Sequence, residues 1–363
     1  MKNQVQLITY VDRLSGDLRR LKALLDGPFC GLFGGVHLLP FFNPIDGADA
    51  GFDPVDHTEV DPRLGGWNDV HALSEDVEVM ADLIVNHISS DSPQFKDFSR
   101  TGANSPFASM FLTYDRVFPM GAREADLLRI YRPRPGLPFT NVILESGESR
   151  LLWTTFTPQQ AGRDGEPGLL APEDVDQLVE TIHSRSNGQS RMATGAAANN
   201  LDLYQVNCTF YDALGRSDNQ YLIARAIQFF VPGIPQVYCI GLLAGTNDME
   251  LLTRSNVGRD INRHYYTPSE VENSLKSPVV QKLVELIRLR NDHPAFAGKA
   301  CVELPDNQRL VIAWENRDHW AKLDVDFSKV RALVTYTQTA VEQEPDIGKW
   351  DSLMSVEALR AIL

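Results

Sequence analysis

Three short segments of the sequence carry side chains that could bind a polar ligand. Asp82-Leu-Ile-Val-Asn-His87 ends an apolar run in an amide and an imidazole, which could contact a hydroxyl-rich ligand or cap a strand. Asp46-Gly-Ala-Asp-Ala-Gly-Phe-Asp-Pro-Val-Asp-His57 is either a solvated turn or a hard-cation site, although it lacks the regular aspartate spacing of a calcium loop. Residues 256–264 contain Arg259, whose guanidinium could clamp a carboxylate or phosphate or form a structural ion pair.

The sequence lacks the short motifs of several common enzyme classes. It contains no GxGxxG fingerprint, no Walker phosphate loop, no HExxH motif and no GxSxG nucleophile elbow. Gly31-Leu-Phe-Gly-Gly35 is rich in glycine but precedes no predicted helix, so it does not indicate a dinucleotide site. The four cysteines form no CxxC pair and are predicted to be reduced and mostly buried.

The polar segments follow apolar runs that predict a parallel sheet. Strands are predicted at residues 5–11, 35–41, 77–85 and about 233–240, with helices at 18–25 and 67–74 between the first three. This alternation is typical of α/β proteins, in which functional residues gather where parallel strands end. Four such strands do not close a barrel.

The alternation stops after residue 92. Residues 93–160 are rich in loops and scattered aromatic residues, which indicates an inserted subdomain. Further helices are predicted at 172–184, from about 219, and at 278–291, whereas 186–189 and 195–200 are predicted to be surface loop. Alternating apolar residues between 310 and 336 predict a small antiparallel β-domain.

Composition excludes some classes of partner. The 363 residues include 34 Lys and Arg against 48 Asp and Glu, a formal net charge of −14. Such a chain lacks the basic surface needed to hold nucleic acid or an anionic membrane. Its most apolar stretch, residues 221–245, is interrupted by Arg225 and two prolines, so no membrane span is predicted. The N-terminus shows no secretion signal, which predicts a cytoplasmic protein.

Several of these segments together resemble the sucrose phosphorylase family, within the α-amylase superfamily (glycoside hydrolase family 13). The resemblance covers nearly the whole chain and weakens only in the tail. It is carried by Gln4-Val-Gln-Leu-Ile-Thr-Tyr10, Leu39-Pro-Phe-Phe42, the segments ending in His57 and His87, Ile130-Tyr-Arg-Pro-Arg-Pro-Gly-Leu-Pro-Phe139, Phe156-Thr-Pro-Gln-Gln160, Ala193-Thr-Gly-Ala-Ala-Ala198, Asn200-Leu-Asp-Leu-Tyr-Gln-Val-Asn207, Pro232-Gly-Ile-Pro-Gln-Val-Tyr238 and Gly258-Arg-Asp-Ile-Asn-Arg-His-Tyr-Tyr266.

The resemblance implies an α/β fold of the (β/α)₈ TIM-barrel type with an inserted subdomain and a small C-terminal β-domain. It implies retaining transfer of the glucosyl group of sucrose to phosphate, without metal or organic cofactor. By matched position, Asp49 and Arg259 would pair at the closed end of the glucosyl pocket, Phe52 would support the sugar ring and His87 would contact a hydroxyl. The acceptor side, where fructose and phosphate alternate, would be lined by Arg134, Asp202, Leu203, Tyr204 and Gln205.

The catalytic carboxyls of the family have no counterpart in this sequence. Residues 161–229 contain no Arg-Leu-Asp nucleophile motif at the end of a predicted strand, no apolar strand ending in Glu and no His-Asp-Gly. Glu145 ends an apolar run but lies within the inserted subdomain, and Asp164 and Glu166 lie in a Gly/Pro-rich turn without a preceding strand. About four missing units of ~30 residues each would amount to ~120 residues. The sequence therefore predicts an internal deletion near Gln160 and Ala161 and an incomplete barrel.

This organisation gives four predicted parts: residues 1–92 (three barrel strands), 93–160 (inserted subdomain), 161–295 (last barrel strand and helices) and 296–363 (β-domain). The first interpretation is a sucrose-phosphorylase-type enzyme impaired by the deletion. The second is a non-catalytic carbohydrate-binding or interaction remnant, and the third is an enzyme completed by a second chain. Preference for sucrose or sucrose 6-phosphate stays open, and the uncovered sheet edges favour a homo-oligomer.

Overall fold

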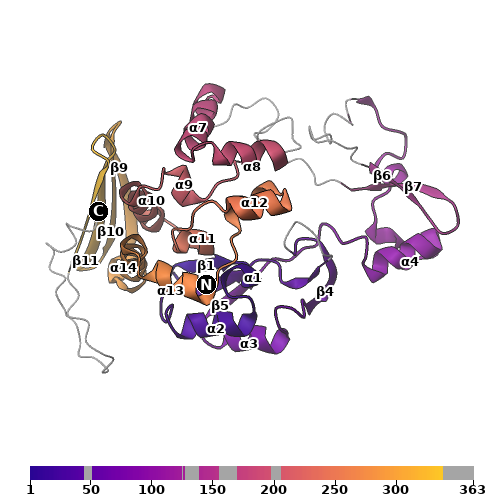
Figure 1. Cartoon of the computed structure of the whole chain (residues 1–363), viewed down its shortest axis with the longest axis horizontal. Coiled ribbons are helices and arrows are strands. Elements are labelled where there is room, and N and C mark those ends of the chain that lie inside the picture. The colour runs from indigo at the N-terminus through magenta and orange to yellow at the C-terminus, as the bar shows by residue number, and fades with distance from the viewer. Residues whose placement is uncertain (45–50, 125, 127–138, 155–169, 198–205, 338–363) are drawn as a thin grey trace.

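A computed structural model describes residues 1–44, 51–124, 126, 139–154, 170–197 and 206–337. The centre of the described fold is a four-stranded, all-parallel sheet in the order β5-β2-β1-β8 (Figure 1). Its strands are β1 (Gln6–Thr9), β2 (Gly35–Leu38), β5 (Glu78–Ala81) and β8 (Gln236–Tyr238). The first strand therefore lies between the second and the last. This is the order expected where a barrel closes, with β5 and β8 at the two edges.

The two faces of this sheet differ in burial. Leu7 pairs in register with Val36 and Val237, and all three side chains are fully buried beneath the helices. On the opposite face, Ile8 pairs with His37 and Tyr238, and all three are half-buried. Parallel sheets are normally covered on both faces. One face of this sheet is covered in that way, and the other is open in part.

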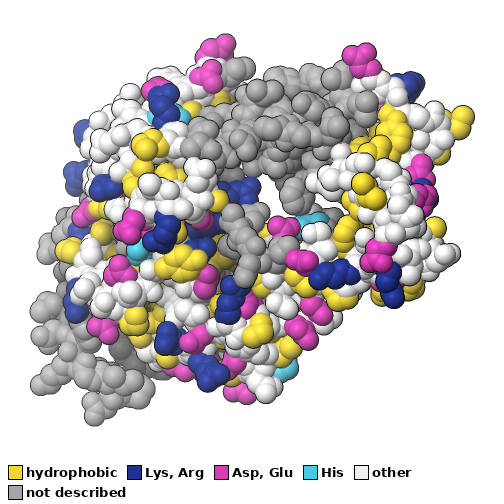
Figure 2. Space-filling model, turned by 45° about the vertical axis from the view of Figure 1, so that its right-hand side comes forward, with side chains coloured by type: hydrophobic (Ala, Val, Ile, Leu, Met, Phe, Trp, Pro, Cys, Tyr) yellow, Lys and Arg dark blue, Asp and Glu magenta, His cyan; other side chains and the backbone are white. Residues whose placement is uncertain are grey.

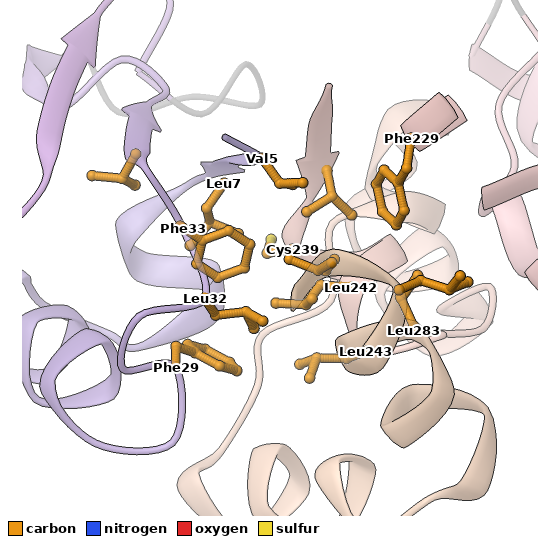
Figure 3. Close-up of a cluster of buried hydrophobic side chains, with 14 of the residues drawn as sticks. Val5, Leu7, Phe29, Leu32, Phe33, Phe229, Cys239, Leu242, Leu243 and Leu283 are labelled. Carbon is orange, nitrogen blue, oxygen red and sulfur yellow. The ribbon is translucent and has the colours of Figure 1, made fainter. Parts of the chain in front are cut away.

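The helices on the covered face present apolar stripes to the sheet. In α2 (Leu18–Asp26), Asp17 caps the N-terminus by accepting from the Arg20 backbone N–H, and Leu18, Leu21 and Leu25 face inward. Figure 3 shows side chains from β1, the loop before β2, α10, α11 and α14 converging on one core. The elements on this side of the sheet are α1 (Val11–Leu14), α3 (Trp67–Ser74), α10 (Asp218–Phe230), α11 (Cys239–Leu242), α13 (Pro268–Leu275) and α14 (Pro278–Asp292).

A separate group of elements follows β5 and lies at the far right of Figure 1. A helix and an antiparallel hairpin of this group enclose a small core of three buried apolar side chains, Phe98, Leu144 and Leu152. The group comprises α4 (Pro93–Thr101), η1 (Gly102–Asn104), η2 (Ala108–Met110), α5 (Tyr114–Val117), β6 (Phe139–Ile143) and β7 (Ser149–Trp153). A second hairpin, β3 (Phe42–Pro44) with β4 (Pro54–Val60), connects β2 to α3.

The C-terminal part is an antiparallel sheet in the order β12-β11-β10-β9. It shares the main core, because Ile312, Trp314 and Leu323 pack in the same cluster as Leu7, and the Trp314 indole donates to the Phe230 carbonyl at 2.6 Å. The strands are β9 (Lys299–Asp306), β10 (Arg309–Asn316), β11 (His319–Asp326) and β12 (Arg331–Tyr336).

A buried arginine ties helix α14 to the N-terminal segment and to the loop before β8. The Arg290 guanidinium is 1 % exposed. It donates to Asn3 Oδ1 at 2.7 Å and to the Gly233 carbonyl at 3.0 Å, and it stacks over the Phe296 ring. The remaining elements are α7 (Pro172–Arg185), α8 (Gln189–Ala197), α9 (Phe210–Ala213), α12 (Met249–Ser255), η3 (Gly258–Asn262) and η4 (Pro294–Ala297).

The parallel sheet of four strands and the antiparallel C-terminal sheet are confirmed, but several predicted boundaries are wrong. Residues 229–230 belong to helix α10, and strand β8 begins only at Gln236 because Pro232 and Pro235 cannot donate to a ladder. Cys239 starts helix α11 instead of continuing the strand, and residues 82–85 lie beyond β5. Residues 189–197, predicted in part as loop, form helix α8. No helix in the described ranges is long and apolar enough to span a membrane.

Candidate functional site

Three of the predicted site residues lie in the described part of the chain: Phe52, His87 and Arg259. The others lie outside the described residues: Asp49, Arg134, Asp202, Leu203, Tyr204 and Gln205. Asp164, Glu166 and the junction between Gln160 and Ala161 lie outside them as well. Glu145 is described, and it is exposed at the turn between β6 and β7. It lies in the separate group of elements around β6 and β7, as the sequence predicts.

Phe52 and His87 form one wall of the candidate site. His87 Nε2 hydrogen bonds with the Phe52 carbonyl and lies 3.7 Å from Asp53 Oδ1. The His87 ring is also contacted through Nδ1 by Asn86 Oδ1 at 3.1 Å. These contacts fix both the ring and the loop before β4. The structure thus brings together two side chains that lie far apart in the sequence.

Arg259 belongs to a second wall, built on the one-turn helix η3. The turn follows α12, which ends at Asn256 in the left-handed conformation with φ 54°. Asp260 and Arg263 of the same turn form an ion pair, with Nη1 and Oδ1 3.6 Å apart and both side chains 7 % exposed. Since the base of the turn is buried and paired, half-buried Arg259 projects from a fixed support.

Tyr10, at the carboxyl end of β1, connects the two walls. Its ring meets that of Phe52 edge to face, with centroids 6.4 Å apart, and meets Tyr238 in the same way at 6.3 Å. Arg263 donates to the Tyr10 hydroxyl at 3.1 Å and its guanidinium lies 5.2 Å from the ring centroid. Tyr10 is 7 % exposed, so its position is set by packing on several sides.

A cavity of about 210 Å³ lies between Tyr10, Tyr238 and the η3 turn, and neither Phe52 nor His87 is among the residues that line it. Figure 2 shows the molecule hollowed in the middle of the viewed face, with Lys or Arg side chains on one side of the opening and acidic and His side chains on another. The described residues that line the cavity are Tyr10, Leu39, Val206, Asn207, Cys208, Tyr238, Arg259, Asn262 and Arg263. None of these described lining residues carries a carboxyl group.

Burial favours the neutral forms of two titratable groups of the cavity wall, Cys208 and Tyr238. Burial raises the pKa of the Cys208 thiol to about 11, so the sulfur is protonated at neutral pH and is no nucleophile. Burial also raises the pKa of Tyr238, whose hydroxyl donates to the Asn262 carbonyl at 3.1 Å. The described wall offers hydroxyl, amide and guanidinium donors over aromatic rings. Such a surface suits a neutral polyhydroxy ligand or one with an anionic group.

Sequence reasoning missed Tyr10, Tyr238 and Arg263 as members of this site. Tyr10 and Tyr238 stand at the carboxyl ends of predicted strands, the same signal that identified Asn86 and His87. Their apolar neighbours made them resemble core residues. Arg263 had no local signal, because its partner Tyr10 is distant in the sequence. No group of three or more His, Cys, Asp or Glu among the described residues is arranged to hold a metal ion.

Comparison with known proteins identifies relatives over most of the chain, although no protein-family model matches it. A sucrose phosphorylase of Agrobacterium vitis is 45% identical, in an alignment that covers 92% of this chain and 97% of the relative. A sucrose phosphorylase of Bifidobacterium adolescentis is 38% identical and is covered over 92% of its length.

Solved structures agree with this assignment. A sucrose 6F-phosphate phosphorylase from Thermoanaerobacter thermosaccharolyticum superposes with a TM-score of 0.76 at 27% identity, over 93% of this chain and 96% of the other. An isomaltulose synthase from Klebsiella sp. LX3, 14% identical, shares the fold with a TM-score of 0.60 over 90% of each chain. With a relative at 45% identity covered over nearly its whole length, this chain belongs to the sucrose phosphorylase family of the α-amylase superfamily, glycoside hydrolase family 13.

Proposed function

We propose that this chain is a sucrose-phosphorylase-type protein that keeps glucosyl-binding residues of the family but lacks its catalytic carboxyls. The reaction implied by the family resemblance moves the glucosyl group of sucrose to phosphate with retention, giving glucose 1-phosphate and fructose. The observation that carries the proposal is the 45% identity to a relative named sucrose phosphorylase, together with a cavity whose described lining contains no carboxyl group.

The described walls support a role in sugar binding. Half-buried Phe52, held edge-on by Tyr10, supplies an apolar surface for a sugar ring, and the bonded His87 ring supplies an oriented polar contact. Arg259 would pair with Asp49 at the closed end of the pocket. On the acceptor side, Arg134 with Asp202, Leu203, Tyr204 and Gln205 would receive phosphate or fructose. These assignments extend the resemblance residue by residue.

Retaining glucosyl transfer requires two carboxyl groups about 5–5.5 Å apart, one as nucleophile and one as acid and base. Two further observations support their loss from this chain. The alignment with the Agrobacterium vitis relative extends over 474 positions although this chain has 363 residues, so over a hundred of those positions match no residue here. Among the described residues, no strand between β5 and β8 along the chain joins this sheet, whose order is β5-β2-β1-β8. We therefore propose that turnover is abolished or greatly impaired.

The remaining parts of the proposal concern organisation and setting. We propose the division into residues 1–92, 93–160, 161–295 and 296–363, supported by the separate small core of the second part and the antiparallel sheet of the last. The ligands would be small molecules, sucrose and phosphate, and no cofactor is required by the scheme. We also propose a cytoplasmic protein that forms a homo-oligomer.

The test combines an activity assay with a binding measurement. A coupled assay for glucose 1-phosphate from sucrose and phosphate should give no signal above background, whereas calorimetry with glucose should show binding. Phe52→Ala should weaken glucose binding about tenfold or more, because the sugar ring loses its apolar platform. The matched control Phe327→Ala, at an exposed residue in the turn between β11 and β12, should leave binding unchanged.

Each result has a separate meaning. Glucose 1-phosphate formation would contradict the proposed loss of the catalytic carboxyls. Absence of glucose binding, or binding that is insensitive to Phe52→Ala, would contradict the proposed sugar site.

A further inference from the structure

The described parallel sheet has four strands, half the number in the barrel that the family resemblance implies, and its first strand is paired to its last. In the described residues each edge strand has one neighbour: β5 pairs with β2 and β8 pairs with β1. All four strands run in the same direction. A two-fold axis along the barrel would therefore place the β5 edge of one copy against the β8 edge of the other at two seams, and would close eight parallel strands.

The β5 edge exposes apolar side chains that a barrel would cover. The chain continues past Ala81 into a segment in which Leu83 is 80 % exposed and Val85 is 79 % exposed. A parallel strand with an open edge and exposed apolar residues is an unusual feature of a soluble fold. Acidic side chains flank this region, with Glu78 on β5 and Asp82 directly after it. Asp82 hydrogen bonds with His37 Nε2 at 2.9 Å and is one-third exposed, and Glu78 lies 3.4 Å from the N-terminal amino group.

The β8 edge borders a cavity of about 410 Å³. Apolar side chains of the wall, among them Ile8, Ile182 and Phe210, lie beside the guanidinium of Arg225. Arg225 is 6 % exposed, donates hydrogen bonds to the side chains of Tyr221 and Gln228, and stacks over the Phe210 ring. No carboxylate of the described residues lies within ion-pair distance of it. A buried cation without an acid is a costly arrangement, and it favours a negatively charged neighbour.

The edge itself is ready to accept a strand. The Pro235 carbonyl accepts a hydrogen bond from the Gln6 backbone N–H of β1. Because successive carbonyls of a strand point to opposite sides, the Gln236 carbonyl points away from β1. The Gln228 side chain donates a hydrogen bond to this carbonyl from Nε2 at 2.7 Å. A side-chain amide can be displaced by the backbone N–H of an incoming strand. The apolar and basic wall at β8 thus complements the apolar and acidic β5 edge.

We propose that two copies of this chain associate through this complementarity, with β5 of each beside β8 of the other, and form one eight-stranded parallel barrel. Both seams are identical by symmetry, so pairing stops at two copies. The net charge of −14 on each copy opposes association, so added salt should strengthen the dimer. This proposal does not depend on sugar binding or turnover.

The test measures the mass of the full chain in solution by light scattering after gel filtration. The wild type should have twice the 40.6 kDa mass of one chain. The double substitution Leu83→Lys with Val85→Lys should raise the dissociation constant on the order of 100-fold by placing charge in both seams. Leu304→Lys is the matched control, since Leu304 is 73 % exposed on β9, the edge of the other sheet. It should leave the dimer intact.

A cross-linking measurement checks the seam directly. Single variants Ala81→Cys and Gln236→Cys, made in a Cys30→Ser, Cys301→Ser background because those two thiols are exposed, should form a disulfide-linked pair when mixed. Neither variant should cross-link by itself. A monomeric wild type, open-ended aggregates, a dimer unaffected by the Leu83 and Val85 substitutions, or a mixture that does not cross-link would each overturn the proposal. Circular dichroism confirms that each variant is folded.

Discussion

The two flanks of the parallel sheet are stabilised to very different degrees. On the β8 flank, α10, α14 and the C-terminal sheet share one continuous core, closed by Arg290 and by the hydrogen bond from Trp314 to Phe230. On the β5 flank, Leu83 and Val85 are exposed, and the elements that follow have a core of only three fully buried apolar side chains. The difference teaches that a barrel fragment can remain well packed where its first and last strands meet while its other edge is left uncovered.

The largest expected difference between the two flanks is in the hydrogen-exchange protection of their backbone amides. Backbone amides at Ile312 and Leu323, in the centre of the C-terminal sheet, should exchange only on global unfolding, whereas amides at Val142 and Leu151 of the β6–β7 hairpin should exchange through local opening. We expect protection factors to differ by about 1,000-fold, roughly 4 kcal/mol. Hydrogen exchange followed by mass spectrometry measures this. Equal protection in both regions would show that the hairpin unfolds together with the main core.

A pair of leucine substitutions compares the flanks by the free energy of unfolding. Leu283→Ala should lower it by about 2–5 kcal/mol, because Leu283 is fully buried in α14 and its loss leaves a cavity. Leu83→Ala, at 80 % exposure, should change it by less than about 0.5 kcal/mol. Urea denaturation of dilute, monomeric protein gives both values. A large effect at Leu83 would mean that the β5 flank is packed more tightly than described.

Substitutions of two tryptophans test the packing contact between the parallel sheet's helices and the C-terminal sheet. Trp314→Phe should destabilise the fold by about 1–3 kcal/mol, because the Phe230 carbonyl loses its indole donor in a buried position. Trp320→Phe is the control, since Trp320 lies on the neighbouring strand and is 41 % exposed, so its effect should be small. Thermal unfolding separates the two. Similar losses would place the stabilisation in general packing and not in this hydrogen bond.

The smallest expected effect concerns the start of α13 on the packed flank. The Glu270 carboxylate accepts from the Thr267 backbone and hydroxyl, both at 2.7 Å, and the backbone bond is the main reason that its pKa is lowered. Because the folded pKa lies below the unfolded one, the stabilisation is present at neutral pH and is lost as the pH falls. Glu270→Gln should therefore destabilise by about 0.5–1 kcal/mol at pH 7 and by much less near pH 3.

The matched control for Glu270 is Glu272→Gln, an exposed glutamate of the same helix. It should change stability little at either pH. Urea denaturation at the two pH values makes the comparison. A Glu270→Gln effect that is equal at pH 7 and pH 3 would rule out the charged capping contact.

The centre of each predicted strand was visible in the sequence, but its ends were not. Apolar, β-branched runs identify β1, β2 and β8, each of which has residues buried against helices, and also β5, whose residues are only half-buried or exposed. Strand length depends on the neighbouring strand, which a local pattern does not report. Residues 83–85, Leu-Ile-Val, are as apolar as any strand, yet they form no ladder beyond β5 in the described fold.

The candidate site also contains residues that the sequence predicts and residues that only the fold reveals. His87 and Arg259 stand in local motifs that predict binding residues, and Phe52 is predicted through the family resemblance. The Tyr10 link could not be predicted in this way, since it arises when Arg263 and Phe52 pack on either side of the end of β1. Local sequence carries the chemistry of each wall, and only the fold brings the walls together. A rule that every polar or aromatic residue ending a predicted parallel strand belongs to the site would have included Tyr10 and Tyr238.

The pairing of β1 with β8 has a consequence for biosynthesis. Gln6 lies opposite Gln236, so the first strand made must wait for roughly 230 further residues before it meets its partner. At about 5–20 residues per second, this delay is on the order of 10–50 s. Throughout that interval Leu7 and Val36 lack part of the core that buries them, because α10, α11 and α14 are still being translated. The order in which the strands appear therefore leaves apolar side chains of the nascent chain without their final cover until synthesis is nearly complete.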